Sequence, residues 1–239
     1  KGAEQYYTLA NNAARSESPE QARAIDDKLI DAWTGHPHLR VVGNQTDFEG
    51  KLQRVMDEIE AVVGTENIET ERKCLVDVVG SLPQASPSLS GGQPSFGTEL
   101  DIYQTYLLAR DGVEQRLRKR GENGHYLYLL TEKRPLGGNS RAEVARIISP
   151  SDYIELLQQA DPSRRTIHKR RLCFIYQEQY FEIDTFLDPP MPHRLLEVES
   201  LPYQADSPIH FPPFLRVVEE VTENPAYYNA NIAKLNDLP

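Results

Sequence analysis

Ionisable and apolar residues alternate along several short segments of this chain. Glu69, Glu71 and Lys73 occupy every second position of the segment 68–76, which ends in apolar residues. In a β-strand, successive side chains point to opposite faces, so these three residues would share one face. A chain built from such segments is expected to fold into a sheet with one ionised face and one apolar face.

The same alternation recurs further along the chain. The paired residues are Arg116 and Arg118, Thr131 and Lys133, Lys169 and Arg171, Glu182 and Asp184, and Glu197 and Glu199. Apolar residues such as Leu117, Ile183 and Val198 lie between them. A single strand with a charged face is most simply exposed to solvent. The repetition favours instead a sheet that closes on itself, with helices over the apolar outer face and the charges inside.

Turn and helix signals place these strands in an α+β chain. Strand candidates cover residues 99–109, 113–120, 124–133, 142–149, 167–177, 180–187 and 194–200. Helices are expected at 18–33, where Ser18 and Pro19 form a start signal, at 46–64, and in a segment capped near Ser151. Residues 36–44 predict a short buried strand, and residues 212–237 predict further helical segments. The segment 80–97 is rich in Ser, Pro and Gly and predicts a long loop.

Composition limits the partners of the chain. The net charge is −10 over 239 residues, which argues against general nucleic-acid binding, because reading a phosphate backbone requires a basic face. No apolar run is long enough to predict a transmembrane segment. Two cysteines do not make a disulfide framework and favour a reducing, cytoplasmic location. Basic residues nevertheless gather between positions 116 and 146 and between 164 and 171, which indicates a local anion site.

A cavity lined by both acids and bases is costly unless a ligand compensates its charges. Carboxylates hold Mg²⁺, and bound Mg²⁺ usually shares its coordination with substrate phosphates. Arg and Lys side chains suit phosphate oxygens. The alternating residues together therefore indicate a metal–polyphosphate site.

In chain order, the motifs "ETERK", "RLRKRG", "LTEK", "HKRR", "EID" and "EVE", followed by "EVTENPAYYNANIA", resemble the CYTH domain, or triphosphate tunnel metalloenzyme family. The resemblance covers residues 66–235. It implies an eight-stranded antiparallel β-barrel, or triphosphate tunnel, with covering helices. Members of the family include inorganic triphosphatases, thiamine triphosphatases, RNA triphosphatases and adenylate cyclases.

Carried over to this chain, the resemblance implies three groups of site residues. The expected catalytic residues are Glu69, Glu71, Lys73 and Glu182. The expected phosphate-binding residues are Arg116, Arg118, Lys133, Lys169 and Arg171. The expected ligands of Mg²⁺ or Mn²⁺ are Glu69, Glu71, Asp184, Glu197 and Glu199. Ala145 departs from the family, which often has a second acid two residues after the position of Glu143; this argues against a second metal and against efficient hydrolysis.

Residues 1–64 resemble the C-terminal portion of a P-loop ATPase domain, of the kind fused to a CYTH domain in eukaryotic proteins. They would form a short α/β segment ahead of a tunnel domain at residues 65–239. The Walker A pattern G-x-x-x-x-G-K-[ST] does not occur here, so a phosphate-binding loop would have to lie upstream.

Two functions follow from these expectations. The first is a metal-dependent triphosphatase acting on an inorganic or organic triphosphate, nucleotides included. The second is a non-catalytic regulatory module whose basic lumen binds a nucleotide, a polyphosphate or a phosphoinositide headgroup.

Overall fold

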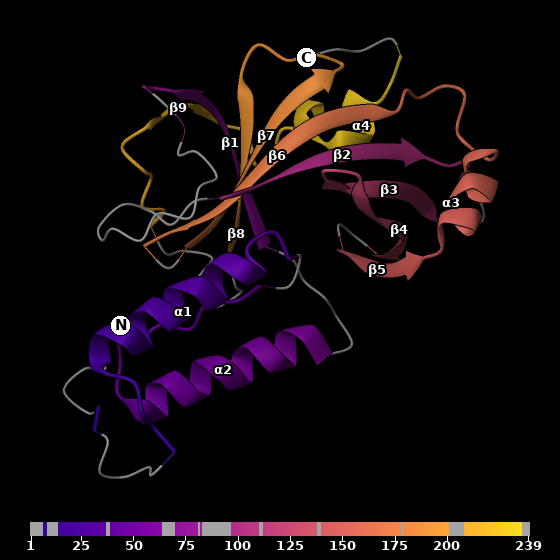
Figure 1. The fold of residues 1–239 in the computed structure, drawn as a ribbon. Helices are drawn as coiled ribbons and strands as arrows, with labels where there is room; N and C mark the ends of the chain where they lie inside the picture. The colour runs from indigo at the N-terminus through magenta and orange to yellow at the C-terminus, as the bar shows by residue number, and fades with distance from the viewer. Residues whose placement is uncertain are drawn as a thin grey trace.

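The computed structural model describes residues 7–8, 14–36, 39–63, 70–80, 82, 97–109, 112–137, 140–177, 179–200 and 208–235. Its centre is a nine-stranded antiparallel sheet with the strand order β5-β4-β3-β2-β6-β7-β8-β1-β9 (Figure 1). The strands are β1 (Thr70–Val78), β2 (Thr98–Tyr106), β3 (Glu114–Glu122), β4 (His125–Gly137), β5 (Ser140–Ile148), β6 (Ile167–Tyr176), β7 (Gln179–Asp188), β8 (Arg194–Ser200) and β9 (Leu215–Glu220). The strand candidates between residues 99 and 200 are confirmed.

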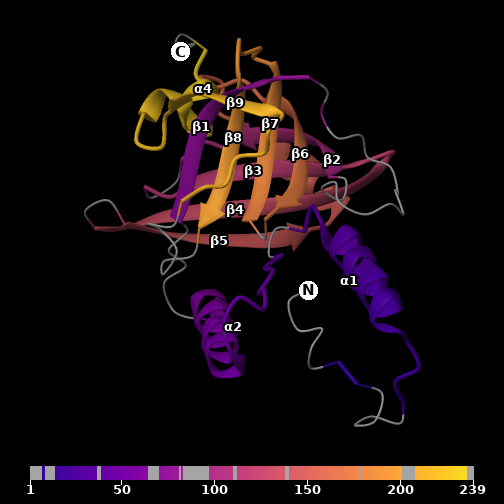
Figure 2. The ribbon, with the colours of Figure 1, turned by 90° about the vertical axis from the view of Figure 1, so that its left-hand side faces the viewer.

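The sheet is strongly twisted but not closed. Strands β4 and β5 run nearly across the direction of β1, β7 and β8 (Figures 1 and 2), as the right-handed twist of successive strands allows. Within the described residues, β5 pairs with β4 alone and β9 with β1 alone. The expected closed eight-stranded barrel is therefore not what the described chain forms. Because β1 already pairs with β8 on one edge and β9 on the other, it has no edge left for another strand.

Four α-helices and a short 3₁₀ helix accompany the sheet in the described residues. They are α1 (Pro19–Trp33), α2 (Phe48–Val63), α3 (Pro150–Leu157), η3 (Pro225–Tyr227) and α4 (Asn229–Ile232). The start signal at Ser18 is confirmed, because its side chain accepts from the backbone N–H of Gln21 in a capping box. Helix α3 is capped by Ser149 rather than near Ser151, since Pro150 takes the first helical position.

Two further expectations from sequence are wrong. Residues 39–43 are irregular and half-buried, not a buried strand, and residues 37–38 lie outside the described chain. Within the segment expected to be helical, Leu215–Glu220 forms strand β9, because its backbone pairs with the free edge of β1. Most of the expected loop at 80–97 lies outside the described residues.

The two faces of the sheet are built from different residues. The outer face of β1, β6, β7 and β8 carries an apolar core whose centre is Cys74, Phe174, Phe181 and Leu196. The outer face of β3 and β4 packs against α3 through Leu117. The opposite face also carries apolar clusters. One lies against the C-terminal segment 221–233, and another is formed by Leu100, Ile102 and Cys173.

Helices α1 and α2 lie at one end of the sheet (Figures 1 and 2). Their large apolar side chains are exposed: Ile25, Leu29, Trp33, Phe48, Leu52, Met56 and Ile59. None of the described helices is both long and apolar enough to cross a membrane. The division of the chain at residues 64 and 65 into an ATPase-like portion and a tunnel domain stays a prediction.

Candidate functional site

Strand register decides which charged residues share a face, because directly opposed residues of paired strands point the same way. Lys73 of β1 opposes Glu197 of β8, which in turn opposes Glu182 of β7. On the other side of β7, Asp184 opposes Arg171 of β6. The ionised positions of these four strands therefore form one continuous surface, which we call the charged face.

The charged face continues across β2 into β3 and β4. Ile102 of β2 opposes both Lys169 and Arg120, and Gln104 opposes Arg118. Arg116 opposes Thr131 of β4. The expected site residues that register brings to this face are Glu71, Lys73, Arg116, Arg118, Lys133, Lys169, Arg171, Glu182, Asp184 and Glu197.

Two expected metal ligands need separate mention. Glu69 lies outside the described residues. The backbone of Glu199 pairs with that of Glu71, and the structure does not describe its side chain. Ala145 of β5 opposes Thr131, so this position of the charged face carries a methyl group rather than a carboxylate.

Arg171 is the centre of the charged face. Its Nε donates to Asp184 Oδ1 at 2.7 Å and its Nη2 to Asp184 Oδ2 at 2.6 Å, a bidentate pair. The same guanidinium contacts the carboxylates of Glu182 and Glu197. All four side chains are buried. Burial alone would lower the pKa of Arg171, but the three carboxylates outweigh it and raise that pKa, so the cation is permanently charged.

Lys169 lies beside this pair and is almost completely buried. Its Nζ donates to Asp184 Oδ2 at 2.5 Å and to Asn229 Oδ1 of α4 at 3.4 Å, and it sits 5.3 Å from the centre of the Phe186 ring. Burial lowers the pKa of Lys169, and the attraction of Asp184 opposes that fall. The C-terminal segment therefore reaches the charged face directly.

Lys73 bridges two carboxylates, with its Nζ 3.0 Å from Glu71 Oε2 and 3.0 Å from Glu197 Oε1. Burial and the neighbouring charge of Glu197 raise the pKa of Glu71 to about 7. The Glu71 side chain keeps 32% of its surface exposed, so solvent limits this effect. Glu197 is more deeply buried, but Lys73 and Arg171 overcome that burial and hold its pKa well below the usual range.

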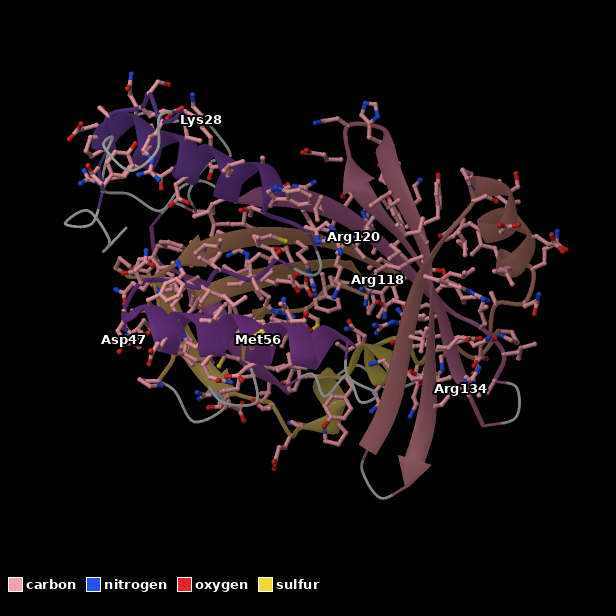
Figure 3. The ribbon with its side chains drawn as sticks, turned by 90° about the horizontal axis from the view of Figure 1, so that it is seen from below. Lys28, Asp47, Met56, Arg118, Arg120 and Arg134 are labelled. Carbon is pink, nitrogen blue, oxygen red and sulfur yellow. The ribbon has the colours of Figure 1, made fainter. Side chains whose placement is uncertain are left out.

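The arginines of β3 belong to the same charged face, on the part of the sheet formed by β2 to β5. Figure 3 shows Arg118 and Arg120 on one side of β3, both directed toward the middle of the molecule. Arg118 Nε donates to Gln104 Oε1 at 3.3 Å, and Gln104 Nε2 donates to the Tyr106 hydroxyl at 2.8 Å. Gln104 is completely buried, so this chain of hydrogen bonds fixes the orientation of the Arg118 guanidinium.

Sequence reasoning did not select three residues that contact this site: Gln104, Arg120 and Asn229. Arg120 shares the strand parity of Arg118, so the signal for it was present in the motif "RLRKRG". Gln104 and Asn229 are neutral and belong to no charge alternation. Gln104 reaches the charged face through the pairing of β2 with β3. Asn229 reaches it because α4 packs back against the sheet.

Among the described side chains, no three His, Cys, Asp or Glu groups are grouped so that they could hold a metal ion. The donor chemistry of the charged face nevertheless fits a hard divalent cation, because Glu71 and Glu197 present carboxylate oxygens to the same ammonium group. The raised pKa of Glu71 indicates that Lys73 alone does not supply enough positive charge for both carboxylates.

No protein-family model and no curated protein matches the chain. A solved structure of the inorganic triphosphatase NE1496 is 28% identical and covers 72% of this chain and 97% of that one, with a TM-score of 0.45. Another structure, of the hypothetical protein NE1496, has the same identity and coverage of this chain, covers 99% of that one and has a TM-score of 0.46. The PH1819 protein of Pyrococcus horikoshii OT3 is 18% identical over 58% of this chain and 82% of its own, with a TM-score of 0.39.

Proposed function

We propose that the charged face binds a triphosphate together with Mg²⁺ or Mn²⁺ and hydrolyses its terminal phosphoanhydride bond. The observation that supports this is the burial of Lys73, Lys169 and Arg171 with carboxylates on one face of the sheet. A buried ion cluster contributes little to stability compared with apolar packing of the same volume. A functional role explains why the chain carries it.

The cations have the chemistry for phosphate oxygens. Arg118 offers a planar donor fork and Lys169 a compact charge, whereas Arg171, whose own fork holds Asp184, contributes positive charge. Gln104 would keep the Arg118 guanidinium oriented before the ligand arrives, which lowers the entropic cost of binding. Lys73, Lys169 and Arg171 would neutralise the negative charge of the phosphates and of the transition state.

Glu71 and Glu197 are the described residues that would hold the metal ion, together with Glu69 and Glu199 as the sequence predicts. When bound, such an ion neutralises phosphate charge and polarises the bridging oxygens. Glu182 would position the attacking water, since its contact with Arg171 fixes the carboxylate in place. The leaving oxygen would be stabilised by the cations that surround it.

A non-catalytic module is the second candidate. Ala145 favours it, because register puts this methyl group on the charged face where a further carboxylate could assist a second metal. In that case the same cations would hold a nucleotide or a polyphosphate without turnover. No contact among the described residues favours a phosphoinositide headgroup over a free polyphosphate.

Phosphate release from tripolyphosphate, ATP, GTP and thiamine triphosphate, with Mg²⁺ or Mn²⁺, tests the proposal. Glu71→Gln should abolish release, because it removes a carboxylate expected to bind the metal. Glu99→Gln is the matched control, since Glu99 is exposed on the other face and pairs with Arg170. Tight binding of tripolyphosphate without release under any condition would instead support the module, and an absence of binding would refute both.

A further inference from the structure

Arg120 differs from the other cations of the charged face. It lies on β3 in line with Arg116 and Arg118, and only 6% of its surface is exposed. In register it opposes Ile102, whose other neighbour is Lys169. Its charge also reaches Cys173, the thiol beside Glu182. Arg120 is therefore part of the same surface.

The partners of Arg120 are unusual for a buried arginine. Its Nη2 donates to the backbone carbonyl of Gly35 at 2.5 Å. Among the described residues, no carboxylate lies within ion-pair distance of it, whereas Arg171 contacts several. A buried charge with no counter-charge is costly. One neutral carbonyl compensates it weakly, so the position suits an anion.

The carbonyl that Arg120 contacts belongs to the turn that follows α1. Gly35 has a φ of +93°, a conformation that other residues rarely adopt. A Cβ at this position would lie 3.3 Å from Cγ2 of Thr98, so the turn fits closely against β2. Glycine thus places a backbone acceptor over the edge of the charged face.

We propose that Arg120 is a further phosphate-binding residue of the charged face, and that a bound phosphate displaces the Gly35 carbonyl from it. This inference rests on the proposed function. An anionic phosphate oxygen is a much stronger acceptor for a guanidinium than a neutral carbonyl is. Occupancy of the charged face would then release the turn after α1, which couples the N-terminal helical segment to the ligand.

The chain carries a natural reporter for this movement. Trp33 is its single tryptophan and ends α1, two residues before Gly35. Its ring meets His36 edge-on, with 5.5 Å between the ring centres. Because Thr34 to His36 link Trp33 to the turn, displacement of Gly35 should change the environment of the indole and its fluorescence emission.

Titration calorimetry with tripolyphosphate at low salt tests the binding role. Arg120→Met should weaken binding about 10- to 100-fold, the usual effect of one charge-assisted hydrogen bond. The affinity of Arg120→Lys should lie between those of wild type and Arg120→Met, since lysine keeps the charge and loses the planar fork. Lys119→Met is the matched control, because Lys119 points to the other face, against Tyr103 and Tyr126, and should bind within about twofold of wild type.

Fluorescence tests the coupling separately. Tripolyphosphate should shift the Trp33 emission of the wild-type protein and of Lys119→Met, but not that of Arg120→Met at saturating ligand. Gly35→Ala leaves Arg120 intact and pushes the turn away from β2. It should therefore bind tripolyphosphate at least as tightly as wild type, and it keeps the inference testable if Arg120→Met fails to fold.

The outcomes separate the two proposals. If Arg118→Met weakens tripolyphosphate binding while Arg120→Met binds like wild type, the role of Arg120 is refuted and the proposed function stands. If wild type binds tripolyphosphate with no change in Trp33 emission, or if Gly35→Ala binds more weakly, the competition with the carbonyl is refuted. If wild type binds no tripolyphosphate, both proposals fall.

Discussion

Removal of Arg171 should destabilise the protein far more than removal of its neighbour Arg170. The Arg171 guanidinium is buried and contacts the carboxylates of Glu182, Asp184 and Glu197. Arg171→Met would leave these buried carboxylates with too little positive charge. Arg170 points to the other face, is 52% exposed in its side chain and pairs with Glu99, which is similarly exposed.

The expected magnitudes differ enough to measure. Breaking a buried ion pair by removing one partner costs about 3–5 kcal/mol. An exposed pair such as Arg170–Glu99 contributes about 0–1 kcal/mol. Lys169 and Lys73 still compensate part of the charge in Arg171→Met, so we expect about 3 kcal/mol, near the lower end of the range for a buried pair.

The pH dependence gives a second signature. In the wild-type protein the low pKa of Glu197 stabilises the folded state above the ordinary glutamate pKa of about 4.3, and this stabilisation is lost as the pH falls through the folded pKa. Arg171→Met reduces that shift. The difference in the free energy of unfolding between wild type and Arg171→Met should therefore be largest near pH 7. It should shrink below about pH 5, where the carboxylates of the variant take up protons.

Urea unfolding followed by circular dichroism, at pH 7 and at about pH 4, measures both effects for wild type, Arg171→Met and Arg170→Met. The reasoning would be refuted if the two variants had the same free energy of unfolding at pH 7. If the loss of unfolding free energy in Arg171→Met did not change with pH, steric packing rather than buried charge would be the cause of the destabilisation.

Three other predictions follow from contacts in the structure. Burial raises the pKa of Cys74 to about 11 and that of Cys173 to about 12, so neither thiol should react with iodoacetamide at pH 8 until urea unfolds the chain; mass spectrometry of the labelled protein checks this. Leu117→Ala should cost about 2–5 kcal/mol in urea unfolding, because Leu117 is completely buried against Leu107, Leu130 and Tyr153, whereas Leu127→Ala, at an exposed position, should cost under about 1 kcal/mol. Gln104→Leu should weaken tripolyphosphate binding about tenfold in calorimetry, since it removes the hydrogen bond that orients Arg118; unchanged affinity would argue that Gln104 has only a packing role.

The strands were predictable because their signal is local. A charged residue at every second position, with apolar residues between, has the period of a strand and not that of a helix. Residues 167–177 and 194–200 were expected as strands and form β6 and β8. Parity within each strand also predicts that Lys169 and Arg171 share a face.

The errors came from pairing between distant segments. Residues 215–220 were expected to be helical, but the edge of β1 accepts them as a strand. Residues 39–43 are apolar enough for a strand and pair with no described strand, so they stay irregular. Closure of the sheet depends on which strands meet at its edges, and parity within a strand carries no information on that.

The site was predictable in composition and not in partners. The sequence predicted that acids and bases share one face. That Arg171 lies opposite Asp184 follows from the register between β6 and β7, which the sequence does not show. Gln104 carried no charge signal at all, although it is buried beneath Arg118. The roles assigned to these residues stay predictions until binding and turnover are measured.

The alternation along each strand has a consequence for how such a chain can change in length. Deleting one residue from the middle of β6 would turn Arg171 toward the apolar core and bring Leu172 or Arg170 into its place. Length changes of a single residue should therefore be tolerated in the connections between strands. Inside a strand they would need a β-bulge to absorb the change, like the register shifts between His168 and Lys169 and between Leu75 and Val76.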